Sequence, residues 1–244
     1  MSQIDLYCGD CFDIMDKIDD NTIDTIIFSP PYNKKGFTKV LKTSGKSHTW
    51  NNYSIDYTYY NDNMERDTYI SWQIDVLEKC LQKLKENGSI FYNHKNIRAN
   101  NKIVFHPYEI IRGLKSGYLY QEIIWNRKNS PNIRNDLLLP TTEKIFWIVK
   151  SKPKVYKQNL DKKFNSEVWD INPKINKLHP ATYPEQLCEN CILLTTNEND
   201  VVLDPFMGIG TTGIACKKLN RNFIGNDLDE NYFNIAVERL FKEM

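Results

Sequence analysis

Four residues that directly follow the apolar run TIDTIIF form a loop with unusual chemistry: Ser29, Pro30, Pro31 and Tyr32. Proline has no N–H and a nearly fixed φ, so the carbonyls of this loop are held rigidly and are not drawn into a helix. The Ser29 hydroxyl and the Pro30 carbonyl then form a cluster of acceptors beside the ring of Tyr32. This cluster suits a planar group that bears an NH₂, because the oxygens accept its N–H bonds and the ring stacks on it. A Pro-Pro turn capped by a packed tyrosine is the alternative interpretation.

A glycine-containing loop follows another apolar run, in the segment VVLDPFMGIGTT at residues 201–212. Glycines let the backbone approach a ligand closely, and the N–H groups that start the next helix favour an anionic group. A further strand ends at Asp227, where an acid is placed to bind ribose hydroxyls. The order strand, Gly-x-Gly, helix, strand and acid resembles a dinucleotide fingerprint, but a third glycine is missing. A dehydrogenase is therefore a competing hypothesis, although it leaves the Ser29–Tyr32 loop unexplained.

Two shorter polar loops precede predicted helices. In HPATYP, His179 and Thr182 supply polar groups, and Pro184 is a normal residue for a first helical turn. Asp10 follows the first predicted strand, and a lone Asp at such a place most often caps the following helix.

These loops must be positioned by an α/β framework, because short β-branched runs alternate with amphipathic stretches along the chain. In open α/β sheets, ligands bind at the carboxyl ends of strands, where these loops fall. The stretch 68–85 places its apolar residues on one stripe, and Asn87-Gly88 is expected to end that helix. We expect strands at Ile4–Cys8, Thr25–Phe28, Ser89–Tyr92, Tyr120–Trp125, Ile145–Val149, Val201–Leu203 and Asn222–Gly225, and helices at Cys11–Ile18, Thr68–Lys85, Pro107–Lys115, Pro184–Thr195, Thr211–Leu219 and Glu230–Phe241.

Two polar, aromatic-rich stretches interrupt this pattern, at residues 33–66 and 151–178, and each is too long for an ordinary connection. The net charge of the chain is only +1, but residues 127–178 hold twelve basic and five acidic residues, whereas both ends of the chain are acidic. A basic surface of this size attracts polyanions, although a solvated lysine-rich face would give the same pattern.

The composition is that of a soluble globular protein. The 244 residues are 41% hydrophobic and 26% charged, which predicts one large α/β domain or one domain with an elaborate insert. No apolar run approaches the ~18 residues of a membrane span, and no signal peptide is evident, so we expect a cytoplasmic protein without membrane contact. The pairs Cys8/Cys11 and Cys188/Cys191 lack the neighbours usual around structural zinc. We interpret them as thiols of a reducing compartment and predict no metal.

Taken together, SPPY, HPATYP and DPFMGIGTT resemble the motifs of the S-adenosylmethionine-dependent DNA amino-methyltransferases, in the permuted order of the β group. The resemblance runs from Gly9-Asp10 to the last helix, and GSIFYNHK, EIIWNRK and EKIFWIVK fit the core elements between the motifs. It implies a Rossmann-like methyltransferase fold, with a single catalytic domain over 1–244 and DNA-binding inserts around 33–66 and 151–178. It also implies S-adenosyl-L-methionine as cofactor and double-stranded DNA as substrate. A cognate restriction endonuclease and a second copy of the chain are further implied partners.

The resemblance implies roles at matching positions. Asp10 would sit near the adenine amino group of the cofactor, Asp227 would bind its ribose, and residues 179–182 would approach its methionine end. Many relatives carry Glu where this chain has Asp227, but the shorter side chain should still reach hydroxyls. The implied catalytic set is Ser29, Pro30, Pro31 and Tyr32; the cofactor set is Asp10, Cys11, Ser29, His179, Pro180, Ala181, Thr182, Asp204, Pro205, Phe206, Gly208, Gly210, Thr211, Thr212 and Asp227; and the DNA-binding set is Lys34, Lys35, Lys152, Lys154 and Lys157.

The implied reaction methylates the exocyclic amine of a base that is extruded from the duplex and stacked on Tyr32. No proline is followed by cysteine, so the Pro-Cys nucleophile of ring-carbon methylation is absent. We expect N4 of cytosine as the acceptor, because relatives that act on adenine usually present Asp or Asn at the position of Ser29. N6 of adenine is the alternative, and RNA or protein glutamine is a more distant one. Neutralising Lys152, Lys154 and Lys157 is expected to weaken DNA binding and flatten its salt dependence.

Overall fold

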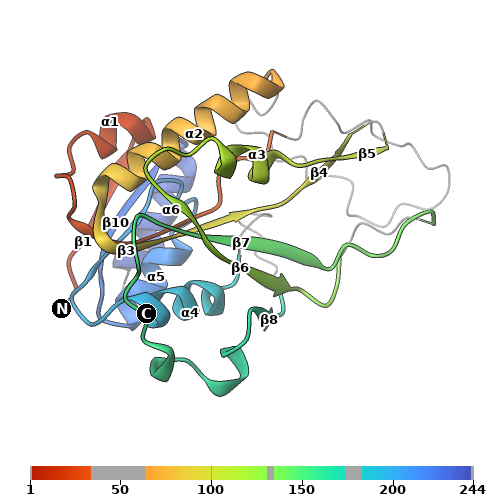
Figure 1. Cartoon of the computed structure of the whole chain (residues 1–244). Helices are drawn as coiled ribbons and strands as arrows, with labels where there is room; N and C mark the ends of the chain where they lie inside the picture. Colours follow the sequence, from red (N-terminus) through yellow and green to blue (C-terminus); the bar gives the residue numbers. More distant parts are fainter. Residues whose placement is uncertain (1, 34–63, 100, 131–134, 174–182, 243–244) are drawn as a thin grey trace.

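The computed structural model describes residues 2–33, 64–99, 101–130, 135–173 and 183–242. At its centre lies an eight-stranded sheet with the order β1-β10-β9-β2-β3-β7-β6-β8 (Figure 1). The first five strands in this order are parallel, β7 is antiparallel to both of its neighbours, and β6 pairs with β8 in parallel. The strands are β1 (Ile4–Cys8), β2 (Ile23–Phe28), β3 (Leu84–His94), β6 (Tyr118–Asn126), β7 (Thr142–Val149), β8 (Val168–Asp170), β9 (Val201–Asp204) and β10 (Asn222–Asp227). This mostly parallel sheet confirms the predicted fold class.

Helices cover both faces of the sheet, which explains why every residue of β2 is buried. Ile26 and Phe28 of β2 pack into a core cluster with the first three helices, and Ile27 packs into a second cluster with the last three. The alternation follows from the two-residue period of a strand. One face carries α1 (Cys11–Met15), α2 (Arg66–Lys83) and α3 (His106–Arg112), and the other carries α4 (Glu185–Thr195), α5 (Thr211–Lys218) and α6 (Glu230–Phe241).

Several predicted boundaries differ from the structure. The expectation that Asn87-Gly88 ends α2 is wrong, because Leu84 is already extended and pairs with Ile23 of β2, so the helix stops at Lys83. Helices α1 and α3 are shorter than predicted. The sequence analysis missed β8, the short helices η2 (Lys157–Asn159) and η3 (Lys162–Phe164), and a two-stranded hairpin formed by β4 (Ile97–Ala99) and β5 (Lys102–Val104).

The sheet topology brings distant loops to one edge. Because β1, β10, β9, β2 and β3 are parallel, their carboxyl ends all lie there, and the Gly9 N–H donates to the Asp227 carbonyl at 3.1 Å. Strand β7 runs the other way, so it begins at this edge, where Lys144 pairs with His94. We call this the carboxyl edge, and the opposite one the amino edge. Within the described residues, no helix is long and apolar enough to cross a membrane. The single-domain organisation stays a prediction.

Candidate active site

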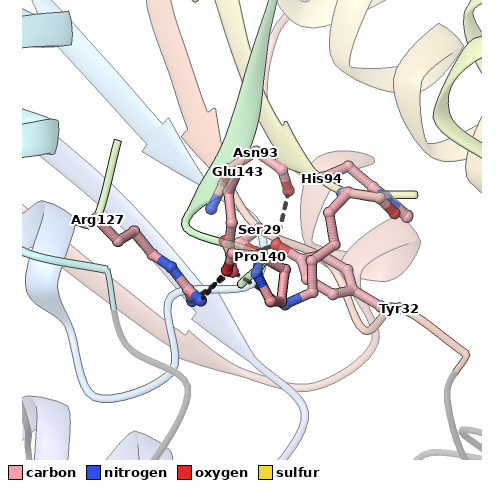
Figure 2. A network of polar contacts seen from close by, with 8 residues as sticks. Ser29, Tyr32, Asn93, His94, Arg127, Pro140 and Glu143 are labelled. Carbon is pink, nitrogen blue, oxygen red and sulfur yellow. Dashed lines mark hydrogen bonds and ion pairs between the residues drawn. The ribbon is translucent and has the colours of Figure 1, made fainter. Parts of the chain in front are cut away.

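The Ser29–Tyr32 loop leaves β2 at the carboxyl edge, and its two hydroxyls contact each other (Figure 2). Ser29 Oγ lies 2.7 Å from the Tyr32 hydroxyl oxygen, and the Tyr32 hydroxyl donates to the backbone carbonyl of Asn93 at 3.3 Å. Whichever hydroxyl donates across the 2.7 Å contact, Ser29 Oγ keeps at least one lone pair to accept a further hydrogen bond. The loop is thus a packed turn and an acceptor site at once.

A second hydrogen-bond chain holds the same loop through the carbonyl of Pro31. The Tyr69 hydroxyl donates to the Pro31 carbonyl at 2.8 Å and lies 2.8 Å from Nε2 of His94. Because Tyr69 has one proton, Nε2 must donate to it, and Nδ1 then accepts from the Lys95 N–H at 2.8 Å. Nδ1 also lies 2.9 Å from the Lys95 carbonyl, but this tautomer satisfies the other three bonds together. The buried Tyr69 and His94 therefore fix the position of the Pro31 carbonyl.

The end of β3 supplies the surroundings of the Tyr32 ring. The ring centroids of Tyr32 and His94 are 4.6 Å apart with an interplanar angle of 32°, and Lys95 Nζ lies 5.7 Å from the Tyr32 centroid. The sequence analysis matched this segment to a core strand but assigned no role to His94 or Lys95. The signal was present, because polar residues follow a buried run at the carboxyl end of a strand.

A buried carboxylate joins two cations next to this ring, and Figure 2 shows its contact with Arg127. Glu143 is 7% exposed, and its Oε1 accepts from Lys95 Nζ at 3.0 Å and from Arg127 Nη1 at 2.8 Å. Pairing with these two cations offsets the cost of burying the carboxylate. Lys95 follows β3, Glu143 lies in β7 and Arg127 follows β6, so the cluster joins three strands at the carboxyl edge. Its formal charge is +1, which adds a positive field beside Tyr32.

The glycine loop after β9 is organised by Asp204, which is fully buried. One carboxylate oxygen accepts from Thr212 at 2.6 Å and from Tyr183 at 2.9 Å, and the other accepts from the Phe206 N–H at 3.1 Å. Burial raises the pKa of Asp204 to about 7, while these donors act in the opposite direction. Asp204 and Thr212, both predicted cofactor residues, are thus engaged with protein groups and hold the loop to α5. Phe206 stacks on Phe28 with centroids 5.6 Å apart, at the root of the Ser29–Tyr32 loop.

The left-handed conformation of Gly208 and Gly210 brings the loop back to β10. Their φ angles are 53° and 77°, which disfavour other residues, and the Gly208 N–H donates to Asp227 at 2.8 Å. Asp227 also accepts from the Asp229 N–H at 2.9 Å, and burial raises its pKa to about 6. Beside it, the Asn226 amide donates to the Gly9 carbonyl at 3.0 Å, so loops after three strands meet here.

The remaining predicted site residues fall into three places. Asp10 caps α1 by accepting a hydrogen bond from the Phe12 N–H at 2.8 Å, which is the helix-capping role that an Asp at such a place most often has. Cys11 is buried. Pro205 and Phe206 lie in the glycine loop after Asp204, and Thr211 lies in the first turn of α5. The predicted residues that lie outside the described residues are Lys34, Lys35, His179, Pro180, Ala181 and Thr182.

Lys152, Lys154 and Lys157 lie at the amino edge, away from the Ser29–Tyr32 loop. The Lys154 N–H donates to the carbonyl of Asn87 at 3.1 Å, near the start of β3 and between Leu84 and Ser89, which pair with β2. The Tyr156 N–H donates to the end of α4 at Leu194. Nothing in the structure brings these lysines to the residues predicted to hold a base, and their DNA-binding role stays a prediction.

All six cysteines are free thiols. The described residues contain no group of three or more His, Cys, Asp or Glu side chains that could hold a metal ion. Cys188 lies 3.8 Å from the Thr212 hydroxyl and is buried with Cys191 in the core, so both pack as small apolar residues there.

Comparison with known proteins places this geometry in a family. Residues 23–238 match the family model described as DNA methylase of the N6/N4 type. The chain belongs to this family. A relative, the type II methyltransferase M.HpaI of Haemophilus parainfluenzae, is 31% identical over 257 residues, which cover 98% of this chain and 74% of that protein. The type II methyltransferase M.BglII of Bacillus subtilis is 28% identical, with 98% and 69% covered.

Solved structures agree with this DNA methyltransferase fold. The PvuII DNA methyltransferase, titled cytosine-N4-specific, has a TM-score of 0.79 at 18% identity and covers 100% of this chain and 88% of that one. M1.HpyAVI in complex with SAM has a TM-score of 0.66 at 26% identity, with 98% and 100% covered. These comparisons confirm the predicted family and the predicted cofactor of that family, S-adenosylmethionine. The base that is methylated is a finer question.

Proposed function

We propose that this DNA methyltransferase transfers a methyl group from S-adenosylmethionine to N4 of cytosine in duplex DNA. The observation that carries the proposal is the Ser29–Tyr32 pair at the carboxyl edge, in which Ser29 Oγ keeps a lone pair for a further hydrogen bond whichever hydroxyl donates. An acceptor is what an exocyclic NH₂ requires. Serine at this position, where relatives that act on adenine usually have Asp or Asn, supports cytosine over adenine.

The residues at the carboxyl edge suit the proposed cofactor. Asn226 Oδ1 is buried and has no hydrogen-bond partner among the described residues, so it is ready to accept from an adenine amino group or a ribose hydroxyl. Each Asp227 oxygen accepts one backbone N–H and keeps a further lone pair for ribose hydroxyls. The backbone at Gly208 has no side chain to keep a ligand away. In this proposal Asp10 and residues 179–182 complete the site. The bound cofactor supplies an electrophilic methyl group on sulfur.

The protein's contribution is to hold and polarise the amine. Ser29 Oγ and the Pro30 carbonyl accept its N–H bonds, which favours a pyramidal nitrogen and disperses the positive charge that develops on it. The Pro31 carbonyl is fixed by Tyr69, so the proline backbone cannot retreat from the base. In this proposal Tyr32 stacks on the extruded base, which offsets part of the unstacking cost.

Nucleoside mass spectrometry of DNA methylated in vitro tests the proposal. We expect N4-methylcytosine from the wild type, and a loss of ~100-fold or more in Ser29→Ala, the usual effect of removing one such hydrogen-bonding group. Tyr32→Ala should also lose the product. Ser151→Ala removes a serine hydroxyl that donates to the Glu86 carbonyl at the amino edge, and it should retain full activity. N6-methyladenine as the sole product would refute the cytosine assignment, and no methylated base at all would refute the reaction.

Two partners belong to the same proposal. Because the relatives are type II methyltransferases, we propose as one partner a restriction endonuclease that cuts the same sequence when it is unmethylated. A homodimer is the second partner that we propose. Light scattering during size-exclusion chromatography, with and without a DNA duplex, would show whether the chain pairs with itself.

A further inference from the structure

The β4–β5 hairpin leaves the carboxyl end of β3 and presents one face to solvent. Its register pairs Ile97 with Val104 and Arg98 with Ile103, so each pair shares a face of the hairpin. Ile97 is 7% exposed, whereas Ile103 is 53% exposed and Arg98 is also exposed. The Ile97 face therefore packs on the protein, and the Arg98 face is the outer one.

The hairpin is basic, and its segment of the chain contains no carboxylate. Residues 87–108 contain no Asp or Glu, and their cationic side chains are Lys95, Arg98 and Lys102. Lys95 is paired with Glu143, as described above. Arg98 and Lys102 are both exposed, and neither forms an ion pair within the parts of the chain that the structure describes. Arg98 thus shares the outer face with Ile103, whereas Lys102 pairs with Ala99 on the other face and is exposed next to the turn.

The hairpin is on the side of the molecule where a target base must enter. Figure 1 shows β4 and β5 beyond the end of β3, on the side away from both termini. Two residues separate β4 from His94, whose ring lies against Tyr32, and Lys95 between them approaches the same ring. A duplex that delivers a base to Tyr32 must lie across this edge.

We propose that the exposed end of the β4–β5 hairpin is a DNA-binding surface, where Arg98 on the outer face and Lys102 beside the turn contact phosphates next to the extruded base. Ile103, on the same face as Arg98, lies against the sugar edge. Phosphate contacts fix the register of a protein on a duplex without reading sequence, and two-stranded ribbons are a known DNA-binding element. This inference rests on the proposed function, because it takes duplex DNA as the substrate. It moves the DNA-contacting cations from Lys152, Lys154 and Lys157 to the edge that carries the site.

The salt dependence of DNA binding tests the assignment. Each phosphate contact contributes about 0.9 to the slope of log K against log salt, so Arg98→Gln/Lys102→Gln should lower the slope by about 1.8. A matched control, Arg112→Gln/Lys115→Gln, removes the same two charge types from exposed positions at the end of α3, and its slope should equal that of the wild type. The triple variant of Lys152, Lys154 and Lys157 to Gln should also keep the wild-type slope.

The outcomes separate this inference from the proposed function. A thermal shift with S-adenosylmethionine that is unchanged in all variants shows that the fold and the cofactor site are intact. An unchanged slope in the Arg98/Lys102 variant, or an equal loss in the Arg112/Lys115 control, would overturn the hairpin surface. If the triple lysine variant alone lowers the slope, the amino edge holds the DNA and the inference is wrong. Wild-type protein that methylates DNA would leave the proposed function standing in each of these cases.

Discussion

Replacing Tyr69 with phenylalanine would test whether the hydrogen-bond chain beneath the Ser29–Tyr32 loop matters for the reaction. The substitution keeps the ring, which packs in the core, and removes only the hydroxyl. That hydroxyl bonds both the Pro31 carbonyl and His94 Nε2 at 2.8 Å. One atom therefore connects the loop to the end of β3.

The expected cost follows from the two groups that lose their partner. The His94 ring is fully buried, and a buried donor without a partner costs about 1–3 kcal/mol. The Pro31 carbonyl is only partly buried, so its lost bond adds about 0.5–1.5 kcal/mol. We expect the free energy of unfolding to fall by roughly 2–4 kcal/mol from these terms. A loop displaced by a fraction of an ångström should also lower kcat by ~10–100-fold, because orientation carries much of the rate.

Urea denaturation and steady-state kinetics measure the two effects, and Tyr92→Phe is the matched control. The Tyr92 hydroxyl donates to Gln73 at 2.8 Å in the same buried region but does not contact the Ser29–Tyr32 loop. Both variants should lose stability, whereas only Tyr69→Phe should lose kcat, with its affinity for S-adenosylmethionine unchanged. Equal kcat values for the two variants, once each is measured below its unfolding transition, would refute the positioning role.

Three further predictions follow from the cofactor loops and the first insert. Burial raises the pKa of Asp204 to about 7 and that of Asp227 to about 6, against ~3.9 for Asp in an unfolded chain. Between about pH 4 and 7 the folded protein therefore binds more protons than the unfolded chain, and its free energy of unfolding should fall as the pH rises through this range. Asp204→Asn should flatten that decline in urea denaturation, and a slope equal to the wild type's would contradict it. Asp227→Ala should weaken S-adenosylmethionine binding ~10-fold or more in calorimetry, since hydrogen bonds to a charged group contribute about 1.5–3 kcal/mol. The Asn33 amide forms two hydrogen bonds with the Met64 backbone, at 2.7 and 2.9 Å. Asn33→Leu should therefore raise the KM for DNA and leave the Kd for the cofactor unchanged. A change in both constants would argue for general unfolding.

Motifs read from the sequence located the loops of the candidate site because each loop follows a recognisable strand. Ser29, Asp204 and Asp227 follow or end three predicted strands, and parallel strands bring their carboxyl ends to one edge. The partners of these residues were not predictable in the same way. Tyr183 and Thr212 meet on Asp204 only after α4 and α5 pack together, and nothing in their spacing of 29 residues indicates that contact.

The β4–β5 hairpin illustrates a signal that was present but weak. Its strands have three residues each, below the length at which alternation can be recognised, and the turn residue Asn101 has a φ of 62°. Asparagine is one of the few residues that adopt this conformation readily, so Asn-Asn between short β-branched runs is typical of a hairpin. The pattern could have predicted the hairpin, but only its position after β3 relates it to the site.

The lysine-rich segment after β7 shows why charge along the sequence does not predict charge at a site. Residues 143–150 look like any core strand, and their direction in the sheet is invisible to periodicity. In the structure β7 is antiparallel to β3, so Glu143 lies beside Tyr32 while Lys152 and Lys154 emerge at the amino edge. A parallel β7 would reverse both positions. The orientation of one strand therefore decides which basic residues can reach the DNA, and it is why the hairpin after β3 is the better candidate.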